Sequence, residues 1–290
     1  MKYKHRLQLF FGALIITAFL IWVGFFVSVR GDSNKDLKVY FFDVGQGDSE
    51  YIKTPDGKDI LIDGGPDDKV LNGLGKVMDF GDRKIDLVVL THPHADHLTG
   101  LLEVVKRYEI GEVWESGVEY PSNTYDAWKA EIQNKNISDK FVTSYDEKDF
   151  GSGKIKFKVL YPLSSEKNKT IDNLNNSSVV TVLEDNRFSV LFMGDLEKSG
   201  QSQIINNLKN YTVLKVAHHG SENGISEDLL KVIRSAIAVI SVGANNKFGH
   251  PAKTTIDLLK SYIVQIYRTD QNGTITISSD GTNYSVQKER

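Results

Sequence analysis

The sequence predicts a mixed α/β domain that follows an apolar N-terminal segment. After residue 36, short apolar runs typical of strands alternate with segments whose apolar residues recur at helical spacing. Several of the strand-like runs end directly in Asp, His or Gly-Asp. Strand ends on one side of a sheet share a rim, so we expect these polar side chains to meet there.

The composition limits the kinds of site and partner. The chain has 290 residues, of which 40% are hydrophobic and 25% charged, and its formal net charge is -3. This length allows one large domain with a substantial core, and the charge gives no sign of a strong polyanion binder. The sequence contains no cysteine, which excludes disulfides and thiolate ligands. Any metal ion must therefore be held by nitrogen and oxygen atoms.

Residues 7–29 form an uncharged apolar run that is long enough to cross a bilayer, which takes about 20 residues. Lys2, Lys4 and Arg6 precede the run, so the positive-inside rule places the N-terminus in the cytoplasm and the following domain outside. We therefore expect a single-pass protein of the cell membrane. A cleaved secretory signal is the main alternative, and a buried helix of the domain is the third. The predicted organisation is an anchor over residues 1–30, a linker over 31–36 and a folded domain over 37–290.

The first half of this domain is expected to alternate between strands and helices. The strands predicted here carry β-branched and aromatic residues, and the helices show apolar stripes. The predicted strands are 37–42, 51–53, 59–62, 85–90 and 111–114, and the predicted helices are 70–78, 98–105 and 123–133.

The second half is expected to contain mostly strands. Residues 154–159 alternate strictly between polar and apolar, which predicts a half-exposed strand, and the Asn-rich residues 164–176 predict a loop. The remaining predictions are a hairpin of strands 178–183 and 188–193, strands 211–217, 237–242 and 264–268, a helix over 254–262 and a last hairpin around Asn272-Gly273.

The densest group of candidate ligands follows the predicted strand 85–90. His92, His94, Asp96 and His97 lie within six consecutive residues, and the first three alternate in what we expect to be an extended loop. Imidazole and carboxylate groups at this density are the ligands of a borderline transition metal. A polar loop with histidines by chance is the alternative. The strand–loop–helix context favours the metal site.

Six short motifs follow one another in a specific order. They are 42–49 (FDVGQGDS), 91–97 (THPHADH), 193–195 (MGD), 214–221 (LKVAHHGS), 241–243 (SVG) and 249–251 (GHP). In their order and spacing they resemble the metallo-β-lactamase superfamily and, more narrowly, the hydrolase domain of ComEC-type competence proteins. The resemblance covers residues 37–286 and implies a four-layer α/β/β/α sandwich, with a hydrolytic metal site on one rim between two sheets.

The resemblance also implies roles for individual residues. It implies two divalent ions, zinc or manganese, with Asp63 as a supporting carboxylate that orients the histidine loop. The superfamily supplies one more histidine to the first ion, but no histidine lies between His97 and Asp195 in this sequence. The implied ligands are His92 and His94 for the first ion, Asp96, His97 and His218 for the second, and Asp195 as the bridge. The candidates for the missing ligand are Asn175, Asn176, Ser177 and Ser178.

Such a site favours hydrolysis by metal-bound hydroxide, with a phosphodiester as the best substrate for two bridged ions. Asp96, His219 and His250 are the candidate catalytic residues; either histidine would donate the proton that the leaving oxygen needs. The remaining predicted pocket residues have polar side chains that would either contact substrate or act as turn and capping residues. These are Gln46, Asp48, Asn176, Ser178, Ser221 and Asn245.

Three functions remain open at this point. The first is a phosphodiesterase or nuclease on the extracytoplasmic side, with a phosphodiester such as DNA as substrate. The second is a lactamase-like amide or ester hydrolase or a cell-wall phosphoester hydrolase. The net charge of -3 slightly favours this second function, because a nuclease profits from a basic channel. The third is a non-catalytic accessory module for DNA uptake. Because one span cannot form a channel alone, such a role would require a separate channel protein.

Overall fold

The fold was obtained as a computed structural model that describes residues 12, 16, 17, 19, 36–151, 153–262 and 264–290. The chain divides into two units, Met1–Lys35 and Asp36–Arg290. The predicted anchor over residues 1–30 lies almost entirely outside the described residues, so it stays a prediction. Within the described ranges, no helix is long and apolar enough to span a membrane.

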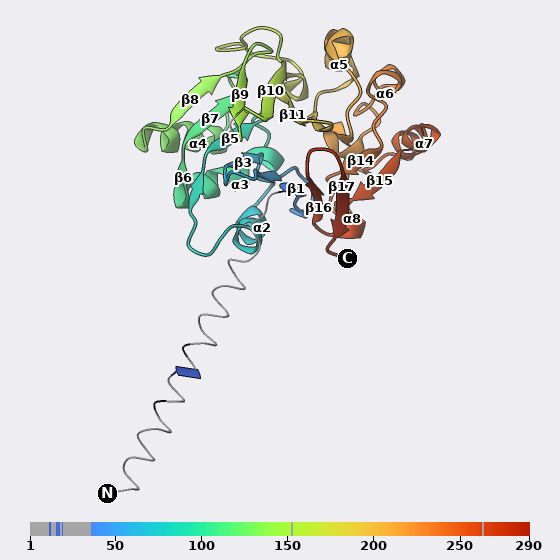
Figure 1. Cartoon of the computed structure of the whole chain (residues 1–290). Coiled ribbons are helices and arrows are strands. Elements are labelled where there is room, and N and C mark those ends of the chain that lie inside the picture. Colours follow the sequence, from blue (N-terminus) through green and yellow to red (C-terminus); the bar gives the residue numbers. More distant parts are fainter. Residues whose placement is uncertain (1–11, 13–15, 18, 20–35, 152, 263) are drawn as a thin grey trace, which may run out of the picture. The chain divides into compact units, whose positions relative to one another are not determined.

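The unit Asp36–Arg290 is built on two large sheets (Figure 1). A small parallel pair, β4 (Lys84–Ile85) with β6 (Glu109–Ile110), accompanies them. The first large sheet contains, in spatial order, β17 (Tyr284–Lys288), β16 (Ile275–Ser279), β1 (Leu37–Phe41), β2 (Glu50–Lys53), β3 (Asp59–Ile62), β5 (Leu87–Leu90), β7 (Glu112–Glu115) and β8 (Ser138–Phe141). The second contains β15 (Gln265–Arg268), β14 (Ile237–Ile240), β13 (Val213–Lys215), β12 (Phe188–Phe192), β11 (Val180–Asp185), β10 (Ile155–Tyr161) and β9 (Glu147–Phe150).

Helices cover the outer faces of both sheets. Apolar residues of α2 (Lys69–Val77), α3 (Ala95–Arg107) and α4 (Asn123–Asn134) pack on the first sheet. Those of α5 (Lys198–Ile204), α6 (Glu227–Ile233) and α7 (Lys253–Ser261) pack on the second sheet. Figure 1 shows these two sets of helices on opposite sides of the unit. The remaining short helices are α8 (Thr269–Asn272), η1 (Leu174–Ser177), η2 (Ile205–Asn207) and η3 (Ala217–Gly220).

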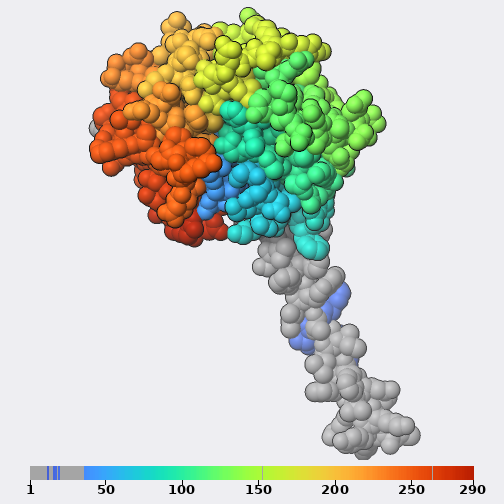
Figure 2. Space-filling view, turned by 180° about the vertical axis from the view of Figure 1, so that it is seen from behind, coloured from blue at the N-terminus to red at the C-terminus, as the bar shows by residue number. Residues whose placement is uncertain are grey.

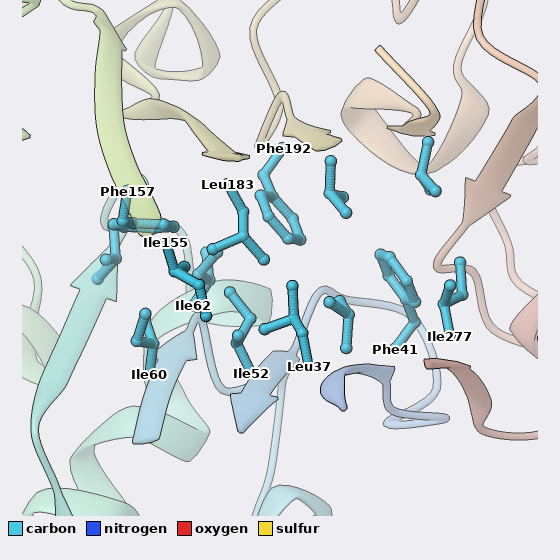
Figure 3. Packing of buried hydrophobic residues seen from close by; sticks show 14 of the residues in the cluster. Leu37, Phe41, Ile52, Ile60, Ile62, Ile155, Phe157, Leu183, Phe192 and Ile277 are labelled. Atoms are coloured by element: carbon cyan, nitrogen blue, oxygen red, sulfur yellow. The ribbon is translucent and has the colours of Figure 1, made fainter. Parts of the chain in front are cut away.

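The main core lies between the two sheets, where alternate residues of facing strands interdigitate. In Figure 3, Leu37, Phe41 and Ile52 of the first sheet face Leu183 and Phe192 of the second. Strand β10 shows the strict alternation of buried and half-buried residues that the sequence predicts for 154–159. With the outer helices, this core gives the expected α/β/β/α order of layers.

The end of the chain differs from the sequence prediction. Strand β15 pairs in parallel with β14, and the chain then crosses through α8 to the first sheet, where β16 pairs with β1. The hairpin predicted around Asn272-Gly273 is therefore wrong, because Gly273 ends α8 with a φ of 66°. An Asn-Gly pair marks either a hairpin turn or a helix end, and local sequence does not separate the two. The last hairpin is β16–β17, which turns at Asp280-Gly281.

Candidate metal centre

The candidate ligands come from both sheets and gather at one rim. Figure 2 shows that surface from early residues (blue) lies beside surface from residues near 250 (orange) on this side of the unit. The loop after β5 and the first turn of α3 supply ligands from the first half of the chain, and the segments after β12 and β13 supply the others. These residues are His92, His94, Asp96, His97, Asp195 and His219.

One oxygen of Asp195 lies at the centre of the group. Asp195 Oδ2 is 3.4 Å from His97 Nε2, 3.8 Å from His92 Nε2 and 3.8 Å from His219 Nε2. The side chain is only 3% exposed, and Oδ1 has no hydrogen-bond partner among the described residues. A buried carboxylate oxygen without a partner is costly, and a cation would satisfy it. The geometry therefore places Asp195 where the sequence analysis places its bridging ligand.

Asp63 holds the base of the histidine loop. Its Oδ1 accepts a hydrogen bond from Thr91 N at 2.9 Å, and its Oδ2 accepts from Thr91 Oγ1 at 2.6 Å. The same Oδ2 lies 2.7 Å from His97 Nδ1. A proton on Nδ1 leaves Nε2 of His97 free toward Asp195, and this buried Nε2 has no hydrogen-bond partner in the described part of the chain. Asp63 thus has the geometry expected of a supporting carboxylate.

Two glycines bring α3 close enough to β3 for this arrangement. A Cβ atom on Gly100 would lie 1.9 Å from the carbonyl oxygen of Gly64, and one on Gly64 would lie 2.2 Å from Leu101 N. The bare backbones allow Gly64 N to donate to His97 O at 2.7 Å. Asp96 belongs to the first turn of α3, whereas the sequence analysis expected it in the extended loop. The glycine contact therefore fixes the turn that carries Asp96 and His97.

His92 and His94 point their ring nitrogens at each other. His92 Nε2 lies 2.9 Å from His94 Nδ1, and His92 Nδ1 lies 3.1 Å from Thr91 Oγ1. Two ring nitrogens at this distance share a hydrogen bond, and both would be available to one cation once the shared proton is displaced. His92 is fully buried, whereas His94 is half-buried and makes an edge contact with Tyr120.

The histidine brought to the centre from the second sheet is His219, not His218. His219 Nε2 lies 3.3 Å from Asp96 Oδ2, and the side chain is 2% exposed. His218 is 25% exposed, and its Nδ1 lies 3.2 Å from Glu197 Oε1. Both residues have left-handed backbones, with φ of 50° and 53°, so their side chains diverge. The family resemblance implied His218 as a ligand, with His219 or His250 as the proton donor. In this structure His219, and not His218, faces Asp195 and Asp96, which makes His219 the better candidate ligand.

The candidates for the missing ligand lie just before β11, and their polar side-chain atoms have different partners. The Asn176 amide accepts from Glu197 N at 3.2 Å and donates to Ser199 at 3.1 Å, so it fixes the start of α5 and does not face the centre. Ser178 Oγ accepts from Asp195 N at 3.0 Å. Asn175 differs, because its buried Oδ1 has no partner among the described residues. Asn175 is therefore a better candidate than Asn176 for the missing ligand.

The other predicted pocket residues differ in burial and in hydrogen-bond partners. Gln46 Oε1 accepts from Gly243 N at 3.1 Å, and Asn245 is exposed in a turn with a φ of 54°. Ser221 is buried, and its hydroxyl has no partner among the described residues. The ring of His250 lies 5.6 Å from that of His218 at the rim. Burial and His218 lower the pKa of His250, which favours a neutral ring and weighs against proton donation at neutral pH.

The charges at the centre are strongly coupled. Burial disfavours charge on His219, but Asp195 and Asp48 outweigh burial and raise its pKa to about 10. Burial likewise opposes charge on His97, and Asp195 and Asp63 nevertheless raise its pKa well above the ordinary value. For His92, burial and the neighbouring His97 lower the pKa well below the ordinary value. Cation binding to His97 and His219 would displace protons.

Four groups of described residues place ligand atoms close enough to hold a cation. Their nitrogen and oxygen donors suit zinc or manganese, and the partnerless His97 Nε2 and Asp195 Oδ1 fit such an ion. His94 and His218 belong to none of the four. The groups are His92–His97–Asp195, Asp96–His97–His219, Asp48–Asp195–His219 and Asp48–Asp63–His97.

The sequence analysis missed several residues that support this centre. Lys215 interrupts the apolar run of β13, and this single charge within a buried strand was the available signal. Glu197 follows Asp195 closely in the sequence and contacts His218, but nothing in the local pattern indicates that contact. Glu50 Oε1 lies 3.9 Å from Lys215 Nζ and accepts a hydrogen bond from Ser241 Oγ at 3.3 Å, and the sequence analysis gave neither Glu50 nor Ser241 a role.

Two curated bacterial proteins are similar to this chain over most of its length. The ComE operon protein 3 of Bacillus subtilis is 29% identical over 259 residues, which cover 82% of this chain and 32% of that protein. Recombination protein 2 of Haemophilus influenzae is 26% identical over 264 residues, which cover 89% of this chain and 31% of that protein. The chain thus spans about a third of the length of these relatives.

A solved structure and a family model agree on the fold. A mutant of the CmlA β-hydroxylase superposes with a TM-score of 0.53 at 12% identity, over 83% of this chain and 53% of that one. The sequence model of the metallo-β-lactamase superfamily matches residues 42–244, which include the histidine loop, Asp195 and His219. With its two facing sheets and a ligand cluster at their rim, this chain belongs to the metallo-β-lactamase superfamily.

Proposed function

We propose that this protein is a metal-dependent hydrolase that cleaves phosphodiesters, with DNA as a candidate substrate. The observation that carries the proposal is the convergence of three imidazole nitrogens on Asp195 Oδ2. Two divalent ions, zinc or manganese, would supply Lewis acidity and a nucleophile at neutral pH. The similarity to Recombination protein 2 of Haemophilus influenzae supports a substrate of the nucleic-acid class.

The side chains of this centre would divide the work of such a hydrolase. His92 and His94 would hold one cation, and Asp96, His97 and His219 the other, with Asp195 between them. Asp63 and Thr91 keep His97 oriented, so little reorganisation is needed at the moment of reaction. His218 and His250 lie at the rim, where they would form hydrogen bonds to the substrate.

Replacing Asp96 with alanine tests this function. We expect turnover of bis(p-nitrophenyl) phosphate and of single- and double-stranded DNA to fall roughly 10³-fold, because several kcal/mol of transition-state stabilisation disappear with a correctly held ion. The full 290-residue chain would be assayed with added Mn²⁺ or Zn²⁺, in a mild detergent because residues 7–29 are apolar.

Asp126→Ala is the matched control, since Asp126 is an exposed acidic residue in the first turn of α4. Its activity should equal that of the wild type. Equal activity of the Asp96→Ala protein would contradict the assignment of the site. Turnover of nitrocefin or a choline-phosphate ester without any cleavage of DNA would instead support the amide, ester or cell-wall hydrolase.

We also propose that this hydrolase acts on the extracytoplasmic side of the membrane, where a separate channel protein would be its partner in DNA uptake. The support is the sequence alone: the basic residues before position 7 and the apolar run 7–29. Protease added to spheroplasts should therefore degrade residues 36–290 without lysis. Protection of this unit until the cells are lysed would contradict the orientation, and a shortened mature N-terminus would favour a cleaved signal.

A further inference from the structure

A buried ion pair joins the two sheets directly behind the candidate metal centre. Lys215 belongs to β13 of the second sheet, and Asp48 belongs to the segment between β1 and β2 of the first. Their side chains are each 1% exposed, and Lys215 Nζ donates to Asp48 Oδ2 and, at 3.1 Å, to Val216 O. Within the described ranges, Lys215 is the only buried lysine. The pair is not an ordinary surface ion pair, so its burial requires an explanation.

Asp48 reaches two of the candidate ligands. Its Oδ1 lies 3.1 Å from His219 Nδ1, and its backbone N donates to Asp96 O at 3.3 Å. The neighbouring Gly47 allows this approach, since a Cβ there would lie 2.3 Å from Asp96 O. Asp96 and His219 belong to the same potential cation group. One residue thus contacts both of these candidate ligands.

The contacts of Asp48 also bear on which ring nitrogen of His219 carries the proton. Nδ1 of this ring hydrogen-bonds to Ser241 O at 3.1 Å and lies 3.1 Å from Asp48 Oδ1, a buried oxygen that has no hydrogen-bond partner among the described residues. These acceptors favour a proton on Nδ1, which leaves Nε2 to face Asp96 and Asp195. The arrangement repeats, on the second sheet, the way in which Asp63 faces Nδ1 of His97.

Two further contacts hold the Asp48 segment against the second sheet. Gln46 Oε1 accepts from Gly243 N at 3.1 Å, and Ser241 Oγ donates to Glu50 Oε1 at 3.3 Å. Gln46, predicted as a pocket residue, therefore fixes this segment to the second sheet. The position of Asp48 relative to His219 is thus determined by several independent contacts.

We propose that Asp48 is a positioning residue that orients His219 for cation binding and that Lys215 holds Asp48 in place. The proposal rests on the metal-dependent function proposed above. A purely stabilising role explains the pair poorly, because a buried ion pair often stabilises no more than apolar residues of similar volume. A carboxylate behind a metal-binding imidazole, in contrast, fixes the ring and strengthens it as a ligand.

Replacing Asp48 with asparagine tests the proposal, because an amide offers one acceptor oxygen where Lys215 and His219 each require one. We expect zinc affinity, measured by competition with a chromophoric chelator, to fall roughly 10- to 100-fold, as for other residues behind metal ligands. The full chain would be used, and the same substitution would be made in a His219→Ala protein. There we expect a change below about threefold, because Asp48 then has no ring to orient.

The two backgrounds separate positioning from general stabilisation. An equal loss of zinc affinity with and without His219, or no loss in either, would overturn the proposal while leaving the metal function intact. A wild-type chain that binds no zinc would overturn both. Asp59→Asn is the matched control: Asp59 is 3% exposed, accepts a hydrogen bond from Tyr51 and lies at the far end of β3 from Asp63. It should unfold at lower temperature yet keep its zinc affinity.

Discussion

Replacing Asp195 with asparagine is expected to lower hydrolytic turnover roughly 10³-fold or more, because the two ions proposed above would lose the negative charge that Asp195 would place between them. The asparagine side chain would fill the same volume as the aspartate, so the packing around it should survive. Three histidine nitrogens lie within 3.8 Å of Asp195 Oδ2, and no other described carboxylate oxygen has this set of neighbours. Metal content by mass spectrometry should fall together with activity.

Thermal unfolding provides a second measure of the same substitution. A ligand that binds only the folded state stabilises it by about 4 kcal/mol at about 1,000 times its dissociation constant. Zinc should therefore raise the melting temperature of the wild type by several degrees and that of Asp195→Asn far less. The Asp59→Asn protein should respond to zinc as the wild type does. An Asp195→Asn protein with full metal content and an undiminished zinc response would show that Asp195 does not bind the ions.

The sequence predicts most strands and helices and the shared rim well, because these depend on local patterns, whereas the four-layer order is what the family resemblance implies. Alternating burial in β10 and the apolar stripe of α3 follow directly from residue periodicity. Asp63 and the histidine loop follow the parallel strands β3 and β5, and Asp195 and His219 follow the parallel strands β12 and β13. Each sheet therefore delivers its candidate ligands at one edge. These features need no knowledge of distant contacts.

Features that depend on distant contacts or on unusual backbone are harder to predict. Asn176 looks as suitable a ligand as Asn175 in the sequence, and only the packing of α5 separates the two. The partner of Lys215 lies 167 residues away, in the other sheet. The crossing of the chain between β15 and β16 likewise depends on which sheet receives the last strands.

The centre joins the two halves of the fold, and this links metal binding to the packing of the sheets. His97 and Asp96 are carried by the first sheet and α3, whereas Asp195 and His219 follow strands of the second sheet. A cation held by all of them would therefore bind the folded unit and not its separate halves. The Asp48–Lys215 pair crosses between the same two sheets, so it would keep the ligands in place before any ion arrives.

The adjacent histidines of η3 give the sharpest test of the ligand set. We expect His219→Ala to lower zinc affinity by roughly 100-fold or more, exceeding the effect of residues that only support ligands. His218→Ala should change the affinity by less than about threefold, because the His218 ring contacts Glu197 and contributes no ligand atom to the cluster. Both affinities would be measured by chelator competition on the full chain.

Each of the two variants serves as the control for the other, because both remove one imidazole from the same turn. The backbones of His218 and His219 are both left-handed, so alanine imposes a similar strain at either position. A difference in zinc affinity must then come from where each ring lies. If His218→Ala loses the metal and His219→Ala retains it, the ligand implied by the family resemblance is correct and the turn adopts another arrangement when the ion binds.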